Sequence, residues 1–552
     1  MKYKKIIGII IITLLLTMQL SAFADSKWLF IYNESSDDAY LSVSYKSNHI
    51  IATGYTMGQY VHVNMWNVNG EKILEKTILT DNGAIGIASI ENNGYIYTTG
   101  AVNDANNNSD VLLAKTDINT EKTVFIKTFG GSEIDEPRNI GVINNCIIII
   151  GNTNSTDGTF ACDPEGSGFI LLLDTEGNIK WTTCVQKGDS TELNDLFIKD
   201  DFVYIVGTVF KNYLSDIFVM KIDKNGKVLW EKTIGGSDYD YGYGIVGDNE
   251  HIYIAGTTFS DNIPGFHGAA GVSSDGIIVA MDHSGNILWQ KAVGGNTDDE
   301  LFDIEKTFLG PVAVGYTRSK EIKGYTGDED FYIISLTEYG KIRYEKAWGA
   351  ERVREELWSI SNSPFDISFV AGWTYTGNQL FGYIAGLDED GEIIDTNFPY
   401  ENSITLRVWQ SNYLKGNTIL SMDQSIFPFI DPRYSRSLVP IRFVAEGMGY
   451  DVEWDSKNRI VTIKGNGKTI KLYMKEALNN KTSFTVRKPT GEQISMTVYE
   501  GSQIATVNGE DITLNAKPLI YQDRTFVPVR FISETMGSTV KWIPPDGIRI
   551  IP

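Results

Sequence analysis

One sequence unit returns seven times between residues 28 and 395, and it constrains the fold of this chain more than any other feature. A clear copy, residues 205–237, holds an apolar run up to Gly207, a strand-like run opened by Asp216 and a third run around Trp230. The glycine ending the second run recurs with a mean period of 53 residues, at Gly54, Gly100, Gly151, Gly207, Gly256, Gly315 and Gly372. Repeats of this length, made of short alternating strands, are typical of four-stranded propeller blades.

The seventh copy lacks its fourth strand, because Asp395 stands where other copies place an aromatic residue. Residues 28–35 carry the missing pattern, with the Trp-to-Ser spacing of residues 230–237. We therefore expect the N-terminal strand to complete the last blade and to close the ring, which removes an open sheet edge. The predicted fold is mainly β, with a seven-bladed β-propeller over residues 25–398, and rings of six or eight blades remain alternatives.

A large apolar residue marks the fourth strand of most copies, and three of these residues are Trp181, Trp230 and Trp289. We expect these side chains to pack between neighbouring blades. The units resemble the tandem repeats of secreted bacterial proteins, and this resemblance implies the propeller fold without indicating a function. Their Gly-x-x-x-Trp pattern also resembles quinone-cofactor dehydrogenase propellers, but the vicinal cysteine pair of that class does not occur here, so no cofactor is predicted.

A second repeat begins in the C-terminal part, where residues 436–454 return 88 residues later as residues 524–542. Each copy predicts a short helix that starts near a proline, Pro440 or Pro528, and that a glycine stops in a left-handed conformation. Two residues of each predicted helix have opposite charges and are four positions apart, which favours ion pairs between Arg442 and Glu446 and between Arg530 and Glu534.

This double motif resembles the copper amine oxidase N-terminal-like domain of exported proteins from Gram-positive bacteria. The resemblance predicts a small α+β domain of two pseudo-repeats over residues 418–552, after a linker of residues 399–417. In amine oxidases the domain is a non-catalytic stalk. The sequence has no histidine after His283, which excludes an imidazole copper site from residues 402–552.

The first 24 residues have the pattern of a signal peptide. Lys2, Lys4 and Lys5 precede an apolar run over residues 6–16, and small residues at 22–24 suit cleavage. We expect the mature chain to begin at Asp25 and to be secreted, in part associated with the cell wall. The apolar run is short for a membrane span and no second long run follows it, so we expect no transmembrane segment.

Charge is distributed unevenly along the chain. Residues 25–400 carry a net charge of −29, whereas residues 401–552 carry +4. The acidic balance argues against nucleic acid as a partner, because phosphate contacts need clustered Lys and Arg. It permits divalent cations or cationic partners.

Acidic clusters recur in the loops that lead from one repeat to the next. Their carboxylates could gather around the centre of the ring and hold calcium through oxygen ligands. The alternative is that they are turn residues at the blade junctions. The candidate calcium ligands are Asp37, Asp38, Asp135, Asp238, Asp240, Asp298 and Asp299.

The chain has only three cysteines, Cys146, Cys162 and Cys184, all in one repeat. A disulfide framework therefore does not hold this fold, and at most one bridge could form. We favour small buried or idle thiols.

No nucleophile, metal-ligand or phosphate-loop pattern stands out in the sequence. The leading hypothesis is therefore a secreted, non-enzymatic protein. Its propeller would bind a cell-wall polymer, polysaccharide or protein, and its C-terminal domain would attach or space it. The alternatives are a polysaccharide-acting enzyme that uses propeller carboxylates and a structural surface-layer component.

Overall fold

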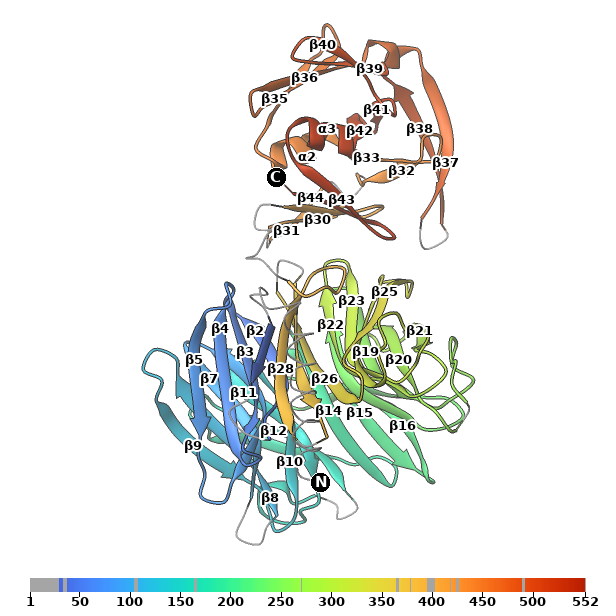
Figure 1. The fold of residues 1–552 in the computed structure, drawn as a ribbon. Helices are drawn as coiled ribbons and strands as arrows, with labels where there is room; N and C mark the ends of the chain where they lie inside the picture. Colours follow the sequence, from blue (N-terminus) through green and yellow to red (C-terminus); the bar gives the residue numbers. More distant parts are fainter. Residues whose placement is uncertain are drawn as a thin grey trace, which may run out of the picture. The chain divides into compact units, whose positions relative to one another are not determined.

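The computed structural model (Figure 1) contains two compact units, Met1–Asn397 and Phe398–Pro552. The structure describes residues 29–32, 37–103, 108–162, 166–269, 271–363, 367–377, 379–394, 403–416, 418–422, 426–488 and 492–551. The predicted signal peptide, Trp28 and Asp395 lie outside these residues.

The first unit consists of antiparallel sheets that follow one another along the chain, and five of them have four strands each. The first two sheets are β2 (Ala39–Lys46), β3 (His49–Thr56), β4 (Tyr60–Asn67), β5 (Lys72–Ile78) and β6 (Ala84–Asn92), β7 (Tyr95–Asn103), β8 (Ser109–Asp117), β9 (Thr123–Phe129). The third sheet is β10 (Asp135–Ile143), β11 (Cys146–Thr153), β12 (Ser167–Leu173), β13 (Ile179–Val185), with the short helix η1 (Gly158–Phe160) in a loop. The fourth and fifth are β14 (Ser190–Lys199), β15 (Phe202–Lys211), β16 (Leu214–Asp223), β17 (Val228–Ile234) and β18 (Asp240–Gly247), β19 (His251–Thr258), β20 (Asp275–Asp282), β21 (Ile287–Val293).

The remaining strands of this unit form one eight-stranded sheet, because a short parallel bridge at Glu329 and Arg354 joins two groups of four. One group is β22 (Asp299–Thr307), β23 (Gly310–Thr317), β24 (Asp328–Leu336) and β25 (Ile342–Trp348). The other is β26 (Val353–Asn362), β27 (Ser368–Tyr375), β28 (Leu380–Leu387) and β1 (Leu29–Tyr32). Strand β1 pairs antiparallel with β28 although the two are far apart in the sequence.

The first strands of successive groups lie beside one another, and each carries a β-bulge. Strand β18 contacts β14 and β22, and β2 contacts both β6 and β26. The bulges begin at equivalent positions, Tyr40, Gly86, Pro137, Leu193, Gly242, Leu301 and Leu357. Since a bulge leaves one extra residue unpaired and re-aims its side chain, each first strand presents an additional side chain at the same level.

Neighbouring sheets share apolar cores. The second and third strands are buried on both faces, which explains their nearly continuous Ile and Val runs. One core joins Ile148 and Ile170 of the third sheet to Ile205 and Phe218 of the fourth. The unit is mainly β with this propeller-like arrangement of sheets.

The fourth-strand aromatic residues pack between sheets, as predicted. Gly285, in the β20–β21 turn, has a φ of +86°, and its Cα faces the Trp230 ring of the preceding sheet so closely that an added Cβ would lie 3.3 Å from it. The indole of Trp230 also donates a hydrogen bond of 3.1 Å to the carbonyl of His283 in that turn. Trp289 donates in the same way to the carbonyl of Glu338, at 2.8 Å.

Cys162 and Cys184 form a disulfide with a Cα–Cα distance of 5.7 Å, whereas Cys146 is free. The expectation of idle thiols is therefore wrong for two of the three cysteines. The reason is spatial: Cys184 lies on β13, and the loop after η1 brings Cys162 beside it. Sequence spacing alone does not reveal that approach.

The C-terminal unit has three sheets and two short helices. The first sheet orders β31 (Thr418–Ser421), β30 (Asn412–Lys415), β29 (Ile404–Arg407), β44 (Gly547–Ile551) and β43 (Thr539–Ile543). The second orders β32 (Phe429–Asp431), β33 (Arg436–Pro440), β42 (Arg524–Pro528), β41 (Leu519–Tyr521), β38 (Gln493–Glu500) and β37 (Lys481–Arg487). The third orders β34 (Asp451–Asp455), β35 (Ile460–Gly465), β36 (Lys468–Tyr473), β39 (Ile504–Val507) and β40 (Glu510–Thr513), and η2 (Lys475–Leu478) follows β36.

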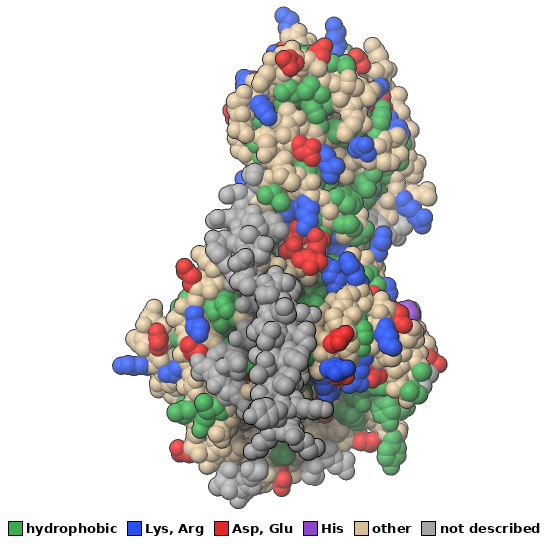
Figure 2. Space-filling model, in the orientation of Figure 1, with side chains coloured by type: hydrophobic (Ala, Val, Ile, Leu, Met, Phe, Trp, Pro, Cys, Tyr) green, Lys and Arg blue, Asp and Glu red, His purple; other side chains and the backbone are tan. Residues whose placement is uncertain are grey.

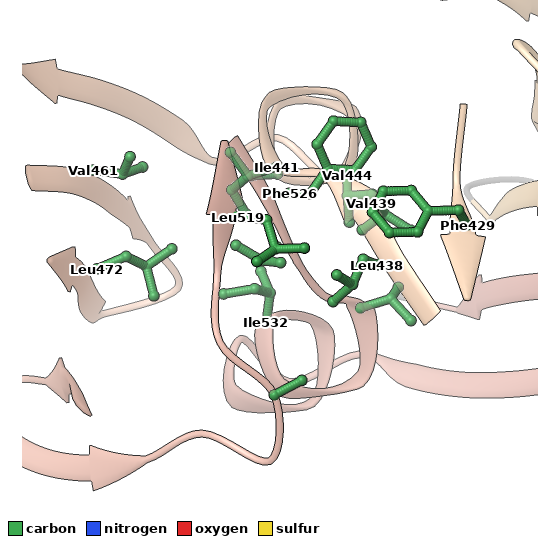
Figure 3. Packing of buried hydrophobic residues seen from close by; sticks show 14 of the residues in the cluster. Phe429, Leu438, Val439, Ile441, Val444, Val461, Leu472, Leu519, Phe526 and Ile532 are labelled. Atoms are coloured by element: carbon green, nitrogen blue, oxygen red, sulfur yellow. The ribbon is translucent and has the colours of Figure 1, made fainter. Parts of the chain in front are cut away.

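The two copies of the C-terminal motif pair with each other at the centre of this unit. Helices α2 (Ile441–Gly447) and α3 (Val529–Thr535) begin directly after their prolines, as predicted. Strands β33 and β42 pair antiparallel with Val439 opposite Val527, which relates the copies by an approximate two-fold axis. Figure 3 shows Leu438, Phe526 and Ile532 converging in the core that these elements share.

The prediction of a linker over residues 399–417 is wrong for its second half. Residues 404–407 form β29, which pairs with both β30 and β44. Ile404 and Leu406 are buried in the C-terminal core, and Thr405 accepts a hydrogen bond of 2.9 Å from the buried Arg549. The strand pairs with the last strand of the chain, so no local pattern marks it.

Candidate binding surface on the first strands

Four of the predicted calcium ligands are buried where the first strands begin. Asp38, Asp135, Asp240 and Asp299 have no exposed surface and lie on four different groups of strands. Asp299 accepts hydrogen bonds from the Gly295 amide and the Ser319 hydroxyl, both at 2.7 Å, and from the Thr317 hydroxyl. The same amide and hydroxyl pattern surrounds Asp135 and Asp240. These carboxylates therefore brace the turns between sheets.

Burial disfavours the charged form of these carboxylates. It raises the pKa of Asp299 to about 6, although the three hydrogen bonds oppose the shift. It raises the pKa of Asp135 and of Asp240 in the same way.

The other three candidates lie in the connecting loops. Asp298 pairs with Arg318 at 2.8 Å, Asp238 accepts a hydrogen bond of 2.9 Å from the Tyr239 amide, and Asp37 is exposed. The fold thus distributes the seven aspartates over four separate junctions, at the starts of β2, β10, β18 and β22. Within the residues that the structure describes, no three His, Cys, Asp or Glu side chains form a group that could hold a metal ion. Calcium binding stays a prediction.

A run of aromatic rings crosses three neighbouring first strands, β18, β22 and β26. The centroids of consecutive rings lie 6.5, 6.2, 5.6 and 4.7 Å apart, and three of the four pairs are stacked. The first and last rings are 39% and 40% exposed, and the rings between them are half-buried. We call this feature the aromatic surface, and its residues are Tyr239, Tyr241, Tyr243, Phe302 and Trp358.

The local sequence explains why these side chains meet. Tyr243, Phe302 and Trp358 are the extra residues of their bulges, so they project at one level from adjacent strands. Tyr241 precedes Tyr243 by two residues and therefore points to the same side of its strand.

Three glutamates border the aromatic surface. Glu300 accepts a hydrogen bond of 2.9 Å from the Tyr316 hydroxyl, and Glu356 accepts one of 2.9 Å from the Trp358 indole. Burial raises the pKa of Glu192 and of Glu300. It raises the pKa of Glu356 to about 7, and repulsion from Glu329 adds to that shift.

Arginine side chains complete the border. The carboxylate of Glu329, which is 1% exposed, accepts hydrogen bonds of 2.8 and 2.6 Å from Nε and Nη2 of Arg354. It also forms an ion pair with Arg318. Burial raises the pKa of Glu329, but the two guanidinium groups outweigh it and the net pKa is lowered. This network joins β24 to β26 through Glu329 and Arg354, and Arg318 extends it to Asp298 in the loop before β22.

The aromatic surface offers two kinds of interaction to a ligand. Exposed rings supply apolar contact area at low entropic cost, and the neighbouring carboxylates accept hydrogen bonds or balance positive charge. None of its residues was a predicted site residue. A signal was present in the sequence: Tyr243, Phe302 and Trp358 each stand three residues after an acidic residue at or near the start of a first strand, in three consecutive repeats.

The surface of the C-terminal unit carries ion pairs as well as exposed hydrophobic side chains, among them Trp454 and Leu478. The predicted pairs Arg442–Glu446 and Arg530–Glu534 form at 3.6 and 3.4 Å, on exposed side chains. A shallow hollow of about 470 Å³ is lined by Glu446, Gly449, Tyr450, Asp451, Val452 and Glu453. On the face of this unit drawn in Figure 2, Lys and Arg side chains lie among Asp and Glu side chains. Throughout the described residues, no helix has the length and apolarity that a membrane crossing requires.

Solved structures that are similar to this chain include a β-propeller domain. The β-propeller domain of the Trilobed protease from Pyrococcus furiosus is 12% identical, covers 68% of this chain and 97% of its own, and has a TM-score of 0.38. Hydrazine synthase from Kuenenia stuttgartiensis is 12% identical over 64% of this chain and 95% of its own, with a TM-score of 0.42. At this identity the likeness concerns the fold alone. No curated protein matches the sequence significantly.

The C-terminal unit matches a family directly. Residues 413–491 and 478–547 each match the copper amine oxidase N-terminal domain. The two matches overlap at residues 478–491, and each contains one copy of the motif. The family therefore covers most of the one compact C-terminal unit, which the resemblance predicts as a domain of two pseudo-repeats.

The prediction that this chain is not an enzyme is wrong, because catalysis is not excluded. Its similar structures include the acylaminoacyl peptidase of Pyrococcus horikoshii, which is 11% identical over 62% of this chain and 52% of that chain, with a TM-score of 0.37. That structure and the propeller domain of the Trilobed protease both come from proteins that are named as enzymes. Lack of a familiar motif in the sequence is therefore no ground for excluding catalysis.

Proposed function

We propose that this chain is an exported protein whose propeller holds a ligand outside the cell on the aromatic surface. The copper amine oxidase N-terminal domain attaches the propeller to the cell surface or spaces it from that surface. The observation that carries the proposal is the unbroken run of five rings, bordered by carboxylates, across β18, β22 and β26.

We further infer that the propeller has seven blades and that β1 closes it. Seven first strands with equivalent bulges support that number. The pairing of β1 with β28 supports closure. So does the hydrogen bond of 3.1 Å that the Val43 amide of β2 donates to the Ser359 hydroxyl of β26, because it joins the first and last groups of strands.

Export and attachment have separate support. The basic, apolar and small-residue pattern of residues 1–24 is that of a secretory signal. The net charge of +4 over residues 401–552 suits contact with anionic wall polymers, in contrast with the acidic propeller.

The proposal can be tested by sedimentation of the chain from residue 25 onward with purified Gram-positive cell walls. We expect the protein to pellet. At a salt concentration that screens the contacts of the C-terminal domain with anionic wall polymers, we expect Trp358→Ala to reduce the pelleted fraction by about tenfold, a loss in the range of interfacial hot spots. The control is Tyr213→Ala, which removes a ring that is 95% exposed in a turn. If the unmodified chain stays in solution, the proposal is wrong. If Trp358→Ala pellets as much as the unmodified chain, the aromatic surface is not the binding site.

A second candidate function is cleavage of the bound polysaccharide, with Glu356 as general acid. The observation that favours it is the pKa of about 7 at Glu356, beside an exposed Trp358 ring. A carboxylic acid that keeps its proton near neutral pH, with further carboxylates nearby, is the arrangement that glycoside hydrolysis uses. Release of reducing ends from wall polysaccharide, abolished by Glu356→Gln without loss of pelleting, would establish this function. No release by the unmodified chain would exclude it.

A further inference from the structure

The side chains around the aromatic surface have an excess of negative charge. Glu136, Glu192, Glu300 and Glu356 occupy the same position in the first strands β10, β14, β22 and β26, two residues before the bulge residue. Arg138 is the one cation among the corresponding bulge residues of the described first strands. Arg318 and Arg354 are already paired with Asp298 and Glu329.

The carboxylates repel one another. Asp298 and Glu329 raise the pKa of Glu300, and Glu329 and Glu300 raise the pKa of Glu356, whereas Arg318 and Arg354 partly oppose these shifts. At Glu192, Arg138 lowers the pKa by more than Glu136 raises it, and burial accounts for the net rise. Deeper along the same strands, burial first and then the neighbouring Asp303 raise the pKa of Asp195 and of Glu305, which favours the neutral forms of these two carboxyls. A cationic ligand relieves this repulsion, whereas an anionic ligand increases it.

The rings add a second requirement. Their run crosses three first strands, and both ends of it are open to solvent, at Tyr239 and Trp358. A single small cation would occupy one ring of this run. A chain of flat rings with apolar faces would occupy several, and aromatic side chains favour such stacking contacts. Positive charge close to the ring faces adds cation–π attraction.

We propose that the aromatic surface binds a polymer of amino sugars with free amino groups. The sugar rings stack on Tyr239, Tyr241, Tyr243, Phe302 and Trp358, and the ammonium groups pair with Glu192, Glu300 and Glu356. This inference rests on the proposed function of the surface as a ligand platform and names the ligand class. Two other ligand classes fit less well. Neutral polysaccharides lack the positive charge that would pair with the glutamates, and Lys-rich protein segments lack the flat rings that would stack on the aromatic side chains.

The test is titration of the full chain with soluble glucosamine oligomers, monitored by calorimetry at several pH values on both sides of pH 7. Glu356 has a pKa of about 7, so binding of an ammonium group below that pH should release the Glu356 proton. N-acetylglucosamine oligomers of the same length are the neutral counterpart, and oligolysine is the counterpart that keeps the charge. We expect the glucosamine oligomer to bind and both counterparts to bind at least about tenfold more weakly.

Variants assign the binding to this surface. The double substitution Glu300→Gln with Glu356→Gln keeps the shape of both side chains and one acceptor oxygen on each, and it removes their charge. We expect it to weaken glucosamine binding by about tenfold or more, and Trp358→Ala to do the same. The control, Glu250→Gln, removes a carboxylate from an exposed turn between β18 and β19. It should leave the affinity unchanged.

Three results overturn the inference. Equal binding of the N-acetylated oligomer removes the role of charge. Stronger binding of oligolysine points to a basic protein segment instead. Binding of glucosamine oligomers that the variants do not weaken places the site elsewhere. If Trp358→Ala weakens binding to cell walls but the unmodified chain does not bind glucosamine oligomers, only the proposed ligand class is wrong. If Trp358→Ala weakens binding neither to cell walls nor to glucosamine oligomers, the proposed function of the aromatic surface is wrong as well.

Discussion

The buried carboxylates at the blade junctions make the stability of the propeller depend on pH. Burial raises the pKa of Asp275 to about 7, of Asp299 to about 6 and of Glu355 to about 9. The folded chain therefore keeps protons that the unfolded chain loses near pH 4. The stabilisation from these groups is complete below about pH 4 and is lost as the pH rises through about 6 to 9, because the folded state then binds more protons than the unfolded state.

We predict that the thermal midpoint of the propeller is higher at pH 5 than at pH 8, by several degrees. Glu355 is 6% exposed and lies beside Asp330, so Glu355→Gln should remove part of this dependence. Calorimetry of both chains over this pH range measures the effect. Glu133→Gln, in an exposed loop, is the control and should preserve the slope. A midpoint that rises steadily from pH 5 to pH 8 would contradict the prediction.

The disulfide leads to a second prediction at this scale. Cys162 and Cys184 close a loop of 22 residues, and loss of such a constraint costs about 3 kcal/mol of stability through the unfolded state. We expect the double substitution to Ser to lower the denaturation midpoint of the propeller, whereas Cys146→Ser alone leaves it nearly unchanged. Equal behaviour of the two variants would show that the bridge is absent or without effect.

At the scale of elements, the repeat pattern predicted the structures that form between residues close together in the sequence. Alternation and turn residues placed the hairpins, the fourth-strand aromatics predicted packing between sheets, and Pro440 and Pro528 placed the two helices. Pairings between distant segments were harder. Strand β29 at Ile404 was missed because its partner β44 lies at the other end of the domain. In contrast, the pairing of β1 with β28 left a signal, since each blade repeats the same strand pattern.

The binding surface was missed for a related reason. The sequence showed Tyr243, Phe302 and Trp358 only as single aromatic residues in three separate repeats. The bulges bring them to one level, and bulges depend on pairing with the next strand. The acidic clusters, in contrast, were conspicuous in the sequence, yet at Asp135, Asp240 and Asp299 they are bonded within their own turns.

The contact between turn glycine and tryptophan can be tested at this scale. Gly285 and Gly94 have similar φ values, +86° and +81°, but a Cβ at Gly285 would meet the Trp230 ring whereas one at Gly94 would meet nothing within 4 Å. We expect Gly94→Ala to cost about 1 kcal/mol from backbone strain alone. Gly285→Ala should cost about 1 kcal/mol more, from crowding of the ring. Equal losses in chemical denaturation would show that the ring moves aside freely.

At the scale of the whole molecule, each unit has its own apolar core. Phe526 is fully buried in the C-terminal unit, and Phe169 is fully buried between the second and third sheets of the propeller. A unit with a complete core can unfold by itself. We therefore expect two calorimetric transitions from the full chain.

Phe526→Ala and Phe169→Ala assign the transitions, because truncating a buried phenylalanine costs about 3–5 kcal/mol. Each variant should lower one transition and leave the other in place. A glucosamine oligomer that binds the aromatic surface should raise only the transition that Phe169→Ala lowers, by about 2.7 kcal/mol at a hundredfold excess over Kd, since a ligand stabilises the unit that holds its site. If both variants and the ligand move one common transition, the two units unfold together. The attachment domain would then be coupled to ligand binding, which a simple spacer would not be.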